Sequence, residues 1–402
     1  ASGHVDAFND PLIDNKDSKK RYRADVLIED YCEKINQKAQ KEIEKARARF
    51  GEAFDEEQFV TTNPRVKEYK ERQKAILQRM AAYLDANNLE DVKALIEELE
   101  IADPETGSKN WTEVRQFNLM FGTKLGASAE NAMDLYLRPE TAQGIFVNFL
   151  NVQKSGRMKV PFGIAQTGKA FRNEIVARQF IFRMREFEQI EMQYFVRPGE
   201  EMKWYELWKE TRLKWHLSLD LGREKYRYHD HEKLAHYANA AADIEFEFPF
   251  GFKELEGIHY RTDFDLKNHQ EYSKKKQQYF DNDINPATGK PYGNYIPYVI
   301  ETSIGLYRMF LAVISHAYTE EDLSTAEKKD ERVVLKIPPK LAPVKLAILP
   351  LVKKDGLPEI ARQLMDECKG SFMCFYEEKD AIGKRYRRMD AIGTPFCVTI
   401  DH

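Results

Sequence analysis

The clearest alternation of apolar and polar positions lies in residues 161–198. In the second half of this stretch, Phe187–Phe195, side chains alternate with a period of two, which predicts a β-strand. Ile190, Met192 and Tyr194 fall on one face, which suits packing on helices. With the strand-like run before it, the stretch predicts a long β-hairpin.

The opposite face of the second arm is polar and carries one ring, two amides and one carboxylate: Phe187, Gln189, Glu191 and Gln193. Such groups suit a buried sheet only where they form the floor of a polar cavity. On the first arm, Arg172 and Glu174 share a face by the same period. The loop between the arms carries three arginines: Arg178, Arg183 and Arg185. This combination predicts a site for a phosphate-bearing nucleotide and a small cationic ligand.

A strand-to-helix junction is expected within Leu135–Leu150. The helical run that ends this stretch places Ile145, Phe146 and Phe149 toward a core. Glu140 then lies at the start of the helix. It is either a capping carboxylate or a substrate ligand, and the local sequence does not decide between the two.

A second junction lies within Tyr298–Val313. Its strand-like first part places Glu301 and Ser303 on one face. The following helix is predicted to bury one apolar stripe: Leu306, Met309, Phe310 and Val313. Arg308 falls off this stripe in the first helical turn, where a cation opposes the helix dipole. An anionic ligand at the helix start explains this arginine better than a structural role.

Residues 27–100 are rich in Glu, Lys, Arg, Ala and Gln, with apolar side chains at helical spacing: Ile76, Met80, Tyr83 and Leu84. This predicts two or three amphipathic helices whose charged faces are better explained as solvated surface than as a binding site. Before them, an extended segment is expected to end at Pro11 and a helix to begin at about Ala24. Arg21 and Arg23 lie at the start of that helix. Considered by themselves, they are interpreted as solvated charge.

The composition changes after residue 320. A charged, proline-containing linker is expected up to about residue 343, and from Val344 the pattern becomes β-α-β-α-β, which predicts a separate small α/β unit. Its second helix carries a basic cluster: Lys384, Arg385, Arg387 and Arg388. A solvated helix face and a contact with RNA phosphates both account for this cluster.

The charge and composition limit the partners and the kinds of site that the sequence predicts. The formal net charge of the 402 residues is −4, so a nucleic-acid partner must be met by a local basic patch. Four cysteines without metal-binding spacing fit free thiols in a reducing cytosol. His229, His231 and His236 lie close together but lack further ligands, and are interpreted as surface histidines.

No apolar run is long enough for a membrane span, and no signal peptide is present. The abrupt start and end of the sequence suggest that the chain is cut at both ends.

Three of these segments together resemble the motifs of class II aminoacyl-tRNA synthetases, specifically the dimeric glycyl-tRNA synthetase family. Pro11 in SGHVDAFNDP resembles the interface proline of the first motif. Phe171–Glu174 and Phe187–Glu191 resemble the two strands of the second, and Gly305–Arg308 the third. The runs LRPETAQGIF and ETSIGLYR are specific to the glycine branch, and IGTPFCVTID resembles its anticodon-binding domain. Some relatives carry cysteines after the first motif; DNKDSKKRYRAD has none, which argues against zinc there.

The resemblance implies an α+β fold, with an antiparallel sheet flanked by helices. We expect a class II catalytic domain in residues 1–330, with insertions at about 27–105 and 199–290. A C-terminal α/β anticodon-binding domain with a mixed sheet is expected in residues 331–402, ending before its last elements.

The implied activity is the activation of glycine with ATP and its transfer to tRNA(Gly). Arg172 and Arg308 would be catalytic, with Arg172 on the α-phosphate and Arg308 over adenine and the γ-phosphate. Phe187 would stack under adenine, and Glu174 would accept a hydrogen bond from its amino group. Further contacts with ATP are implied for five residues: Asn173, Phe182, Arg183, Met184 and Leu255. Glu254 would help to place ATP through Mg²⁺.

The implied glycine pocket surrounds an ammonium group with carboxylates and one hydroxyl: Glu140, Glu191, Glu301 and Ser303. Arg23 would reach the carboxylate of glycine, and four residues would complete the pocket: Phe187, Gln189, Thr302 and Gly305. Exclusion of the larger alanine by size then removes the need for an editing domain, and the sequence shows no second catalytic constellation.

The implied partners are glycine, ATP, tRNA(Gly) and a second copy of the chain, in the cytoplasm and without a membrane. The main alternative is a synthetase-like paralogue that binds nucleotide but charges no tRNA, although both motif arginines argue against it. Another class II specificity, such as serine, threonine or proline, would need a roomier pocket or a partner for a hydroxyl group.

Overall fold

The computed structural model describes residues 2–51, 54–128, 131–175, 177, 179–231, 234, 238–325 and 329–402. The chain forms two compact units, one of residues 3–122 and one of residues 123–402 with the first two residues. Arg178 and His236, which the sequence singled out, lie outside the described residues.

The unit of residues 3–122 combines helices with a small antiparallel sheet of order β2-β1-β3. Its helices are α1 (His4–Ala7), α2 (Ala24–Phe50), α3 (Glu56–Thr62), α4 (Pro64–Asp85) and α5 (Leu89–Glu98). Its strands are β1 (Asn9–Asp14), β2 (Arg21–Arg23) and β3 (Arg115–Asn118). The helix start at Ala24 is confirmed, and Ile76 and Met80 are buried as their spacing predicts. The extended segment was predicted to end at Pro11, but it continues to Asp14.

The second unit is built on a six-stranded sheet of order β6-β7-β13-β10-β9-β8, in which all neighbours are antiparallel. Its strands are β6 (Phe162–Phe171), β7 (Glu186–Val196), β8 (Tyr226–Asp230), β9 (Ala240–Phe248), β10 (Gly251–Thr262) and β13 (Tyr298–Gly305). The hairpin predicted in residues 161–198 is therefore confirmed as β6 and β7, and the predicted antiparallel sheet is confirmed as well.

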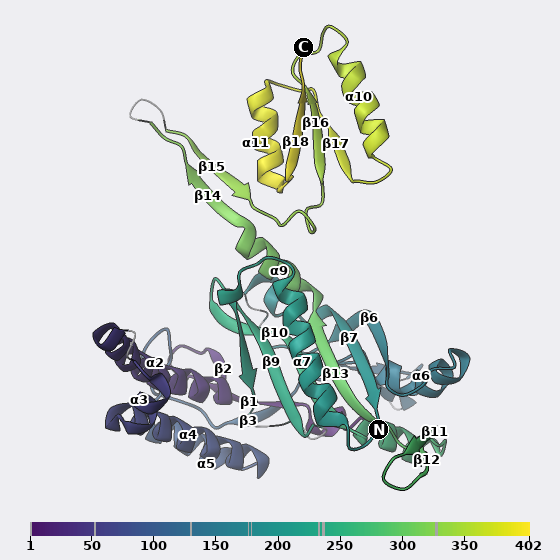
Figure 1. The fold of residues 1–402 in the computed structure, drawn as a ribbon. Helices are drawn as coiled ribbons and strands as arrows, with labels where there is room; N and C mark the ends of the chain where they lie inside the picture. The colour runs from purple at the N-terminus through teal and green to yellow at the C-terminus, as the bar shows by residue number, and fades with distance from the viewer. Residues whose placement is uncertain are drawn as a thin grey trace. The chain divides into compact units, whose positions relative to one another are not determined.

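Helices cover the two faces of this sheet unequally (Figure 1). On one face, α7 (Glu201–Leu217) and α9 (Leu306–Ala317) pack on an apolar core that includes Ile258 and Ile300. On the other, α6 (Ala142–Ser155) and α8 (Phe264–Ser273) pack on an apolar cluster that includes Phe195. The rest of this second face is left to polar side chains, which form the floor described below.

Two expectations about burial are wrong. Ile190 is 37% exposed and Phe310 is 57% exposed, although both were predicted to pack inside. Tyr194, on the same face as Ile190, does pack against Trp204 and Trp208 of α7. Period-two alternation assigns a side chain to a face of the strand, but it does not indicate how far a helix reaches along that face.

Strands also occur in stretches where the sequence analysis placed none. The expected linker contains an antiparallel hairpin of β14 (Tyr318–Asp322) and β15 (Glu331–Leu335). Residues 199–245 contain α7, then β8 and the start of β9. The unit also holds two small hairpins, β4 (Gly122–Leu125) with β5 (Met133–Tyr136) and β11 (Tyr279–Asn285) with β12 (Lys290–Tyr295).

The C-terminal segment follows the predicted β-α-β-α-β order: β16 (Leu346–Pro350), α10 (Leu357–Cys368), β17 (Cys374–Tyr376), α11 (Ile382–Ile392) and β18 (Phe396–Ile400). Its described strands are parallel, not the mixed sheet that we expected. The basic cluster on α11 is largely used within the fold. Arg385 is buried and donates to the Pro350 carbonyl, whereas Arg388 pairs with Glu377 and Arg387 with Asp330. This arrangement favours the structural interpretation over a contact with RNA.

Candidate active site

The polar floor is formed where β6, β7, β13 and β10 lie side by side. Glu191 of β7 is opposite Gln166 of β6 and Ser303 of β13, and Ser303 is in turn opposite Gly257 of β10. The alternating face predicted for β7 is therefore continued across four strands. Glu191 and Glu301 are each 2% exposed, so the floor buries carboxylates.

A single buried guanidinium organises the carboxylates of this floor. Arg261 is 1% exposed and donates to Glu301 at 2.8 Å, to both oxygens of Glu140 at 3.3 Å, and to Asp265 at 2.9 and 3.2 Å. Because three carboxylates share one cation, the cluster has excess negative charge. Glu140 is thus held by Arg261 in the core and does not serve as a simple helix cap.

Glu191 lies beside this cluster but makes no ion pair with Arg261. It accepts hydrogen bonds from the backbone N–H and the hydroxyl of Thr141, with 2.7 Å between the Thr141 nitrogen and Oε2, and from the Ser303 hydroxyl at 3.1 Å. Burial and the charges of Glu301 and Glu140 raise the pKa of Glu191 to about 7. A cation placed beside it would favour its ionised form.

The pKa of Glu301 is shifted in the opposite direction to that of Glu191. Burial disfavours its charge, but Arg261, His259 and Gln193 outweigh that effect and lower its pKa to about 2. His259 Nδ1 lies 3.0 Å from Oε1, and Gln193 donates to Oε2. The site therefore contains one carboxylate that is firmly ionised and one that titrates near neutrality.

Positive charge and aromatic surface lie at the hairpin end of the floor. The Arg172 guanidinium is 5.3 Å from the centre of the Phe187 ring, and its Nε donates to the Pro139 carbonyl at 3.4 Å. Arg183 lies 3.5 Å from Glu174 in an ion pair. The Arg185 side chain donates to the Glu174 carbonyl at 2.7 Å, which closes the loop between the arms. The predicted neighbours Arg172, Glu174, Arg183 and Phe187 are therefore brought together.

A β-bulge in β10 brings Glu254 to Arg308. The pairing register shifts between Glu254 and Glu256, so Leu255 packs into the core while Glu254 turns away from the core and meets the Arg308 side chain. The Arg308 guanidinium lies 2.9 Å from Glu254 Oε2 and 4.3 Å from the centre of the Phe182 ring. The Arg308 charge lowers the pKa of Glu254 to about 2.

The bulge is held from the other face of the sheet. Glu256 is 1% exposed and binds Arg212 of α7 at 2.5 Å and His216 of α7 at 2.7 Å. A buried carboxylate with these two partners fixes the strand at the residue after the bulge. Glu254 and Glu256 are consequently directed to opposite faces although they are two residues apart.

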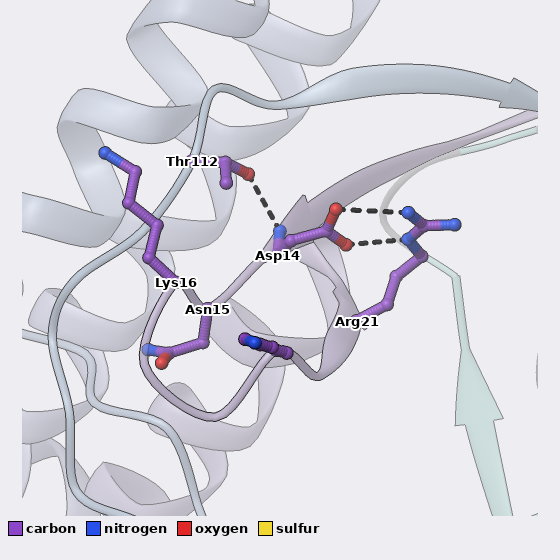
Figure 2. A pocket seen from close by; sticks show the side chains of 6 residues that line it. Asp14, Asn15, Lys16, Arg21 and Thr112 are labelled. Atoms are coloured by element: carbon purple, nitrogen blue, oxygen red, sulfur yellow. Dashed lines mark hydrogen bonds and ion pairs between the residues drawn. The ribbon is translucent and has the colours of Figure 1, made fainter.

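The loop that follows Pro11 forms a pocket in the unit of residues 3–122. Figure 2 shows Arg21 turned onto Asp14, and the two make hydrogen bonds of 2.6 and 3.1 Å. Among the residues that the structure describes, no group of three or more His, Cys, Asp and Glu side chains is arranged to hold a metal ion. No described helix is long and apolar enough to cross a membrane.

Comparison with known proteins finds relatives that match the whole length of the chain. Residues 10–119 match the glycyl-tRNA synthetase insertion domain 1, residues 124–317 the tRNA synthetase class II core domain (G, H, P, S and T), and residues 345–402 the anticodon binding domain. The glycine–tRNA ligase of Chlorobaculum tepidum is 51% identical over all of this chain and 77% of its own length. Those of Staphylococcus saprophyticus and Geobacillus thermodenitrificans are each 46% identical over all of this chain and 76% and 75% of their own lengths.

The chain belongs to the glycine–tRNA ligase family. The resemblance drawn from its motifs is confirmed, and so is the class II fold that it implied.

Thr302 and Leu255, which the resemblance to glycyl-tRNA synthetases assigns to the site, do not direct their side chains to the floor. Thr302 is opposite Met192 and Ile258, so its side chain lies on the helix-covered face. Leu255 is 1% exposed within the apolar core. Either residue can reach a ligand over the floor only through its backbone. Met184 and Asn173 are half-buried in the loop region of the hairpin.

Arg23 belongs to the other unit of the chain. It ends β2, and its guanidinium pairs with Asp25 at 2.5 Å and Asp10 at 3.3 Å. Its proposed contact with the carboxylate of glycine stays a prediction. Gly305 ends β13 at the start of α9, next to the Arg308 side chain.

The sequence interpretation missed Arg261, His259 and Asp265. A signal was available, because Gly257, His259 and Arg261 alternate with period two in the run GIHYRT. Extending the strand beyond Gly257 would have placed His259 and Arg261 on the same face. The pairing of Asp265 with Arg261 follows from the turn into α8 and had no comparable signal.

Proposed function

We propose that this chain is a glycine–tRNA ligase: it converts glycine and ATP into glycyl-adenylate and pyrophosphate, then transfers glycine to the 3′ end of tRNA(Gly). The observation that carries this proposal is the floor itself, where a carboxylate cluster adjoins an arginine-and-ring surface on one sheet. A negatively charged end suits an ammonium group, and a positively charged end suits phosphates. The membership of the family supports the same reaction.

In the first step, an oxygen of the glycine carboxylate attacks the α-phosphorus of ATP. The bond from that phosphorus to the bridging oxygen breaks, and pyrophosphate leaves with the electron pair. Arg172 offsets the negative charge that develops at phosphorus, and no protein nucleophile is required. In the second step, a ribose hydroxyl of tRNA attacks the adenylate carbonyl and AMP leaves.

The nucleotide takes its place between the two arginines. Adenine stacks on Phe187 with its amino group toward Glu174, while Arg308 covers the other side and reaches the γ-phosphate. Arg183 adds positive charge for the phosphates. Two contacts support this arrangement. The Arg172 guanidinium lies over the Phe187 ring, and the Arg308 guanidinium lies over the Phe182 ring.

Mg²⁺ would bind near Glu254. The chemistry of this side chain fits, because its pKa of about 2 keeps it an anionic oxygen donor at neutral pH. Protein sites for Mg²⁺ commonly use one or two carboxylates and leave the other positions to water and phosphates. When bound, the ion would neutralise charge on the phosphates.

The glycine ammonium fits the excess negative charge around Glu191, Glu301 and Glu140. Support comes from two buried amide oxygens, of Gln189 and Gln193, which have no hydrogen-bond partner among the described residues. An ammonium group has three donors and can use such acceptors. Ser303 would add a further contact.

The affinity for glycine is predicted to depend on pH through Glu191. A bound ammonium requires the ionised carboxylate, so below pH 7 binding must also remove a proton. The KM for glycine should therefore fall about tenfold per pH unit as the pH rises toward 7, and then level off. Glycine-dependent ATP–pyrophosphate exchange at pH 6 to 8.5 measures this dependence.

The matching variant is Glu191→Gln, which keeps the shape but cannot titrate. Its KM for glycine should rise by roughly 10- to 100-fold at pH 8, lose the pH dependence, and change far more than the KM for ATP. A variant that keeps the wild-type pH slope would remove Glu191 from glycine binding.

Alanine should be excluded by size and not by hydrolysis. Its methyl group would have to displace a wall of the pocket or desolvate a carboxylate, so exchange with alanine should be at least about tenfold weaker than with glycine. Alanyl-tRNA(Gly) incubated with the protein should lose alanine no faster than in buffer. Rapid deacylation would contradict this view of selectivity.

Two further features complete the proposal. We expect a homodimer through the segment around Pro11, because that segment resembles the interface motif of the class. We also expect the protein to work in the cytoplasm. The four free cysteines are in keeping with such a compartment.

A further inference from the structure

Arg138 is a cation beside the floor that takes no part in the proposed binding of ATP or of the glycine ammonium. Its side chain is exposed, and it directly precedes the buried Pro139 and Glu140. The strand β6 is the first of the sheet, and Arg138 lies along its outer edge. The Arg138 carbonyl accepts from the Phe171 N–H at 2.9 Å, and its Nε donates to the Lys169 carbonyl at 2.6 Å. These two bonds fix the residue against β6.

Gly168 leaves the space in which the Arg138 guanidinium lies. Gly168 is two residues from Gln166, which is opposite Glu191, so it faces the floor. A Cβ atom at position 168 would be 2.8 Å from Arg138 Nη2 and 3.3 Å from Thr141 Cγ2. Both distances are shorter than an ordinary carbon contact, so any other side chain would displace the guanidinium. The Arg138 charge therefore lies over the floor, next to the threonine that binds Glu191.

The positive charge of Arg138 has no carboxylate partner among the described residues. Its one described side-chain hydrogen bond uses Nε, which leaves the four N–H groups of Nη1 and Nη2 for a ligand. Other arginines of the floor are already paired, as Arg261 is with Glu301 and Arg308 with Glu254. Of these three arginines, Arg138 is the one available to an anionic oxygen.

The strand register indicates which part of the substrate lies near Arg138. Floor positions on β6 and β7 form three successive pairs about 7 Å apart: Ala170 with Phe187, Gly168 with Gln189, and Gln166 with Glu191. In the proposed function, adenine and the α-phosphate lie at the first pair and the glycine ammonium at the third. The carboxyl group of glycine joins the α-phosphate to the carbon that bears the ammonium, so it lies over the middle pair. That pair contains Gly168, over which the Arg138 guanidinium is held.

We propose that Arg138 is a further catalytic residue, which binds the glycine carboxylate oxygen that does not attack phosphorus. This oxygen becomes the carbonyl oxygen of glycyl-adenylate. The inference rests on the proposed function, because the positions of the α-phosphate and the ammonium are taken from it. It also gives the substrate carboxylate a cation from the same unit of the chain as the floor.

Arg138 then acts in the transfer step as well as in activation. The ribose hydroxyl oxygen of tRNA forms a bond to the carbonyl carbon, and an electron pair of the C=O bond moves onto the oxygen beside Arg138. When this tetrahedral intermediate collapses, the bond to the phosphate oxygen breaks and AMP leaves with its electron pair. The hydroxyl proton is released to solvent. A fixed cation stabilises the oxyanion more than the uncharged carbonyl, so it lowers the barrier.

Two stable analogues of the adenylate test the contact with that oxygen. Both are sulfamoyl adenosines. One carries a glycyl group, and the other carries a 2-aminoethyl group, which keeps the ammonium but lacks the carbonyl oxygen. In the full chain, Arg138→Met should raise the Kd of the glycyl compound by about 10- to 100-fold. The Kd of the 2-aminoethyl compound should stay at the wild-type value, and calorimetric titration measures both.

The same variant should transfer glycine from enzyme-bound adenylate to tRNA(Gly) about 10²-fold more slowly in a single turnover. Arg138→Lys keeps a charge but not the paired donors, so its transfer rate should fall between those of Arg138→Met and the wild type. Lys169→Met is the matched control. It removes a half-exposed cation that pairs with Glu186 and lies on the opposite face of β6 from Gly168, and it should leave both assays unchanged.

Equal weakening of the two analogues would show that Arg138 only shapes the pocket, through the segment that carries Thr141, and would overturn the inference. Wild-type affinity for the glycyl compound, or a wild-type transfer rate, would overturn it as well. In each of these cases, charging of tRNA(Gly) by the wild type would still support the proposed function. Failure of the wild type to charge tRNA(Gly) would count against the proposed function instead.

Discussion

Arg172→Ala is expected to lower glycine-dependent ATP–pyrophosphate exchange by about 10²- to 10³-fold. The reason is that this guanidinium lies next to the Phe187 ring, at the end of the floor where we propose that the α-phosphate binds. Removing it leaves the charge that develops at phosphorus without its main partner. The effect should appear in kcat, because the interaction strengthens in the transition state.

The fold of the Arg172→Ala protein should be nearly unchanged, with a thermal midpoint within a few degrees of the wild type. Lys169→Ala is the matched control. It removes a cation three residues earlier, which is half-exposed and pairs with Glu186, and it should leave exchange unchanged. Near-normal exchange in the Arg172 variant would take this residue out of the mechanism.

Arg261→Met is expected to destabilise the protein by about 3–5 kcal/mol, because it leaves three buried carboxylates without their cation. The loss should grow with pH. In the wild type, Glu301 has a pKa of about 2, below the usual 4.5, so its stabilising effect is complete above about pH 4.5 and is lost as the pH falls toward 2. In the variant that effect is absent, and the ionised carboxylates repel one another.

Denaturant unfolding at pH 3 and pH 8 measures this difference. Arg261→Lys is the control, since it keeps the charge but loses the paired donors, and it should fall between the wild type and Arg261→Met. Equal stability of the methionine variant and the wild type at both pH values would show that Arg261 does not hold the carboxylates together.

The sequence was most informative where a local period coincides with a polar face. Gln189, Glu191 and Gln193 alternate with apolar residues, and this alternation alone indicated the floor. Arg308 stood out because its position in the first helical turn is unfavourable for a cation. Both signals depend on neighbouring residues and on simple electrostatics.

Other features depend on contacts between distant segments. Arg261 is joined to Glu140, which is 121 residues away in the chain, and no local pattern predicts such a pair. The bulge that separates Glu254 from Glu256 breaks the period that a strand prediction relies on. Phe310 is 57% exposed although it belongs to the apolar stripe predicted for α9. The sequence therefore predicted which face of a helix or strand a side chain lies on. It predicted less well which parts of that face are covered by other elements.

The most direct test is a crystal structure with glycine and a non-hydrolysable ATP analogue. The account predicts adenine on Phe187 between Arg172 and Arg308, the α-phosphate beside Arg172, and the glycine ammonium within hydrogen-bond distance of Glu191. Glycine or nucleotide bound away from these residues, at concentrations that saturate the enzyme, would contradict it.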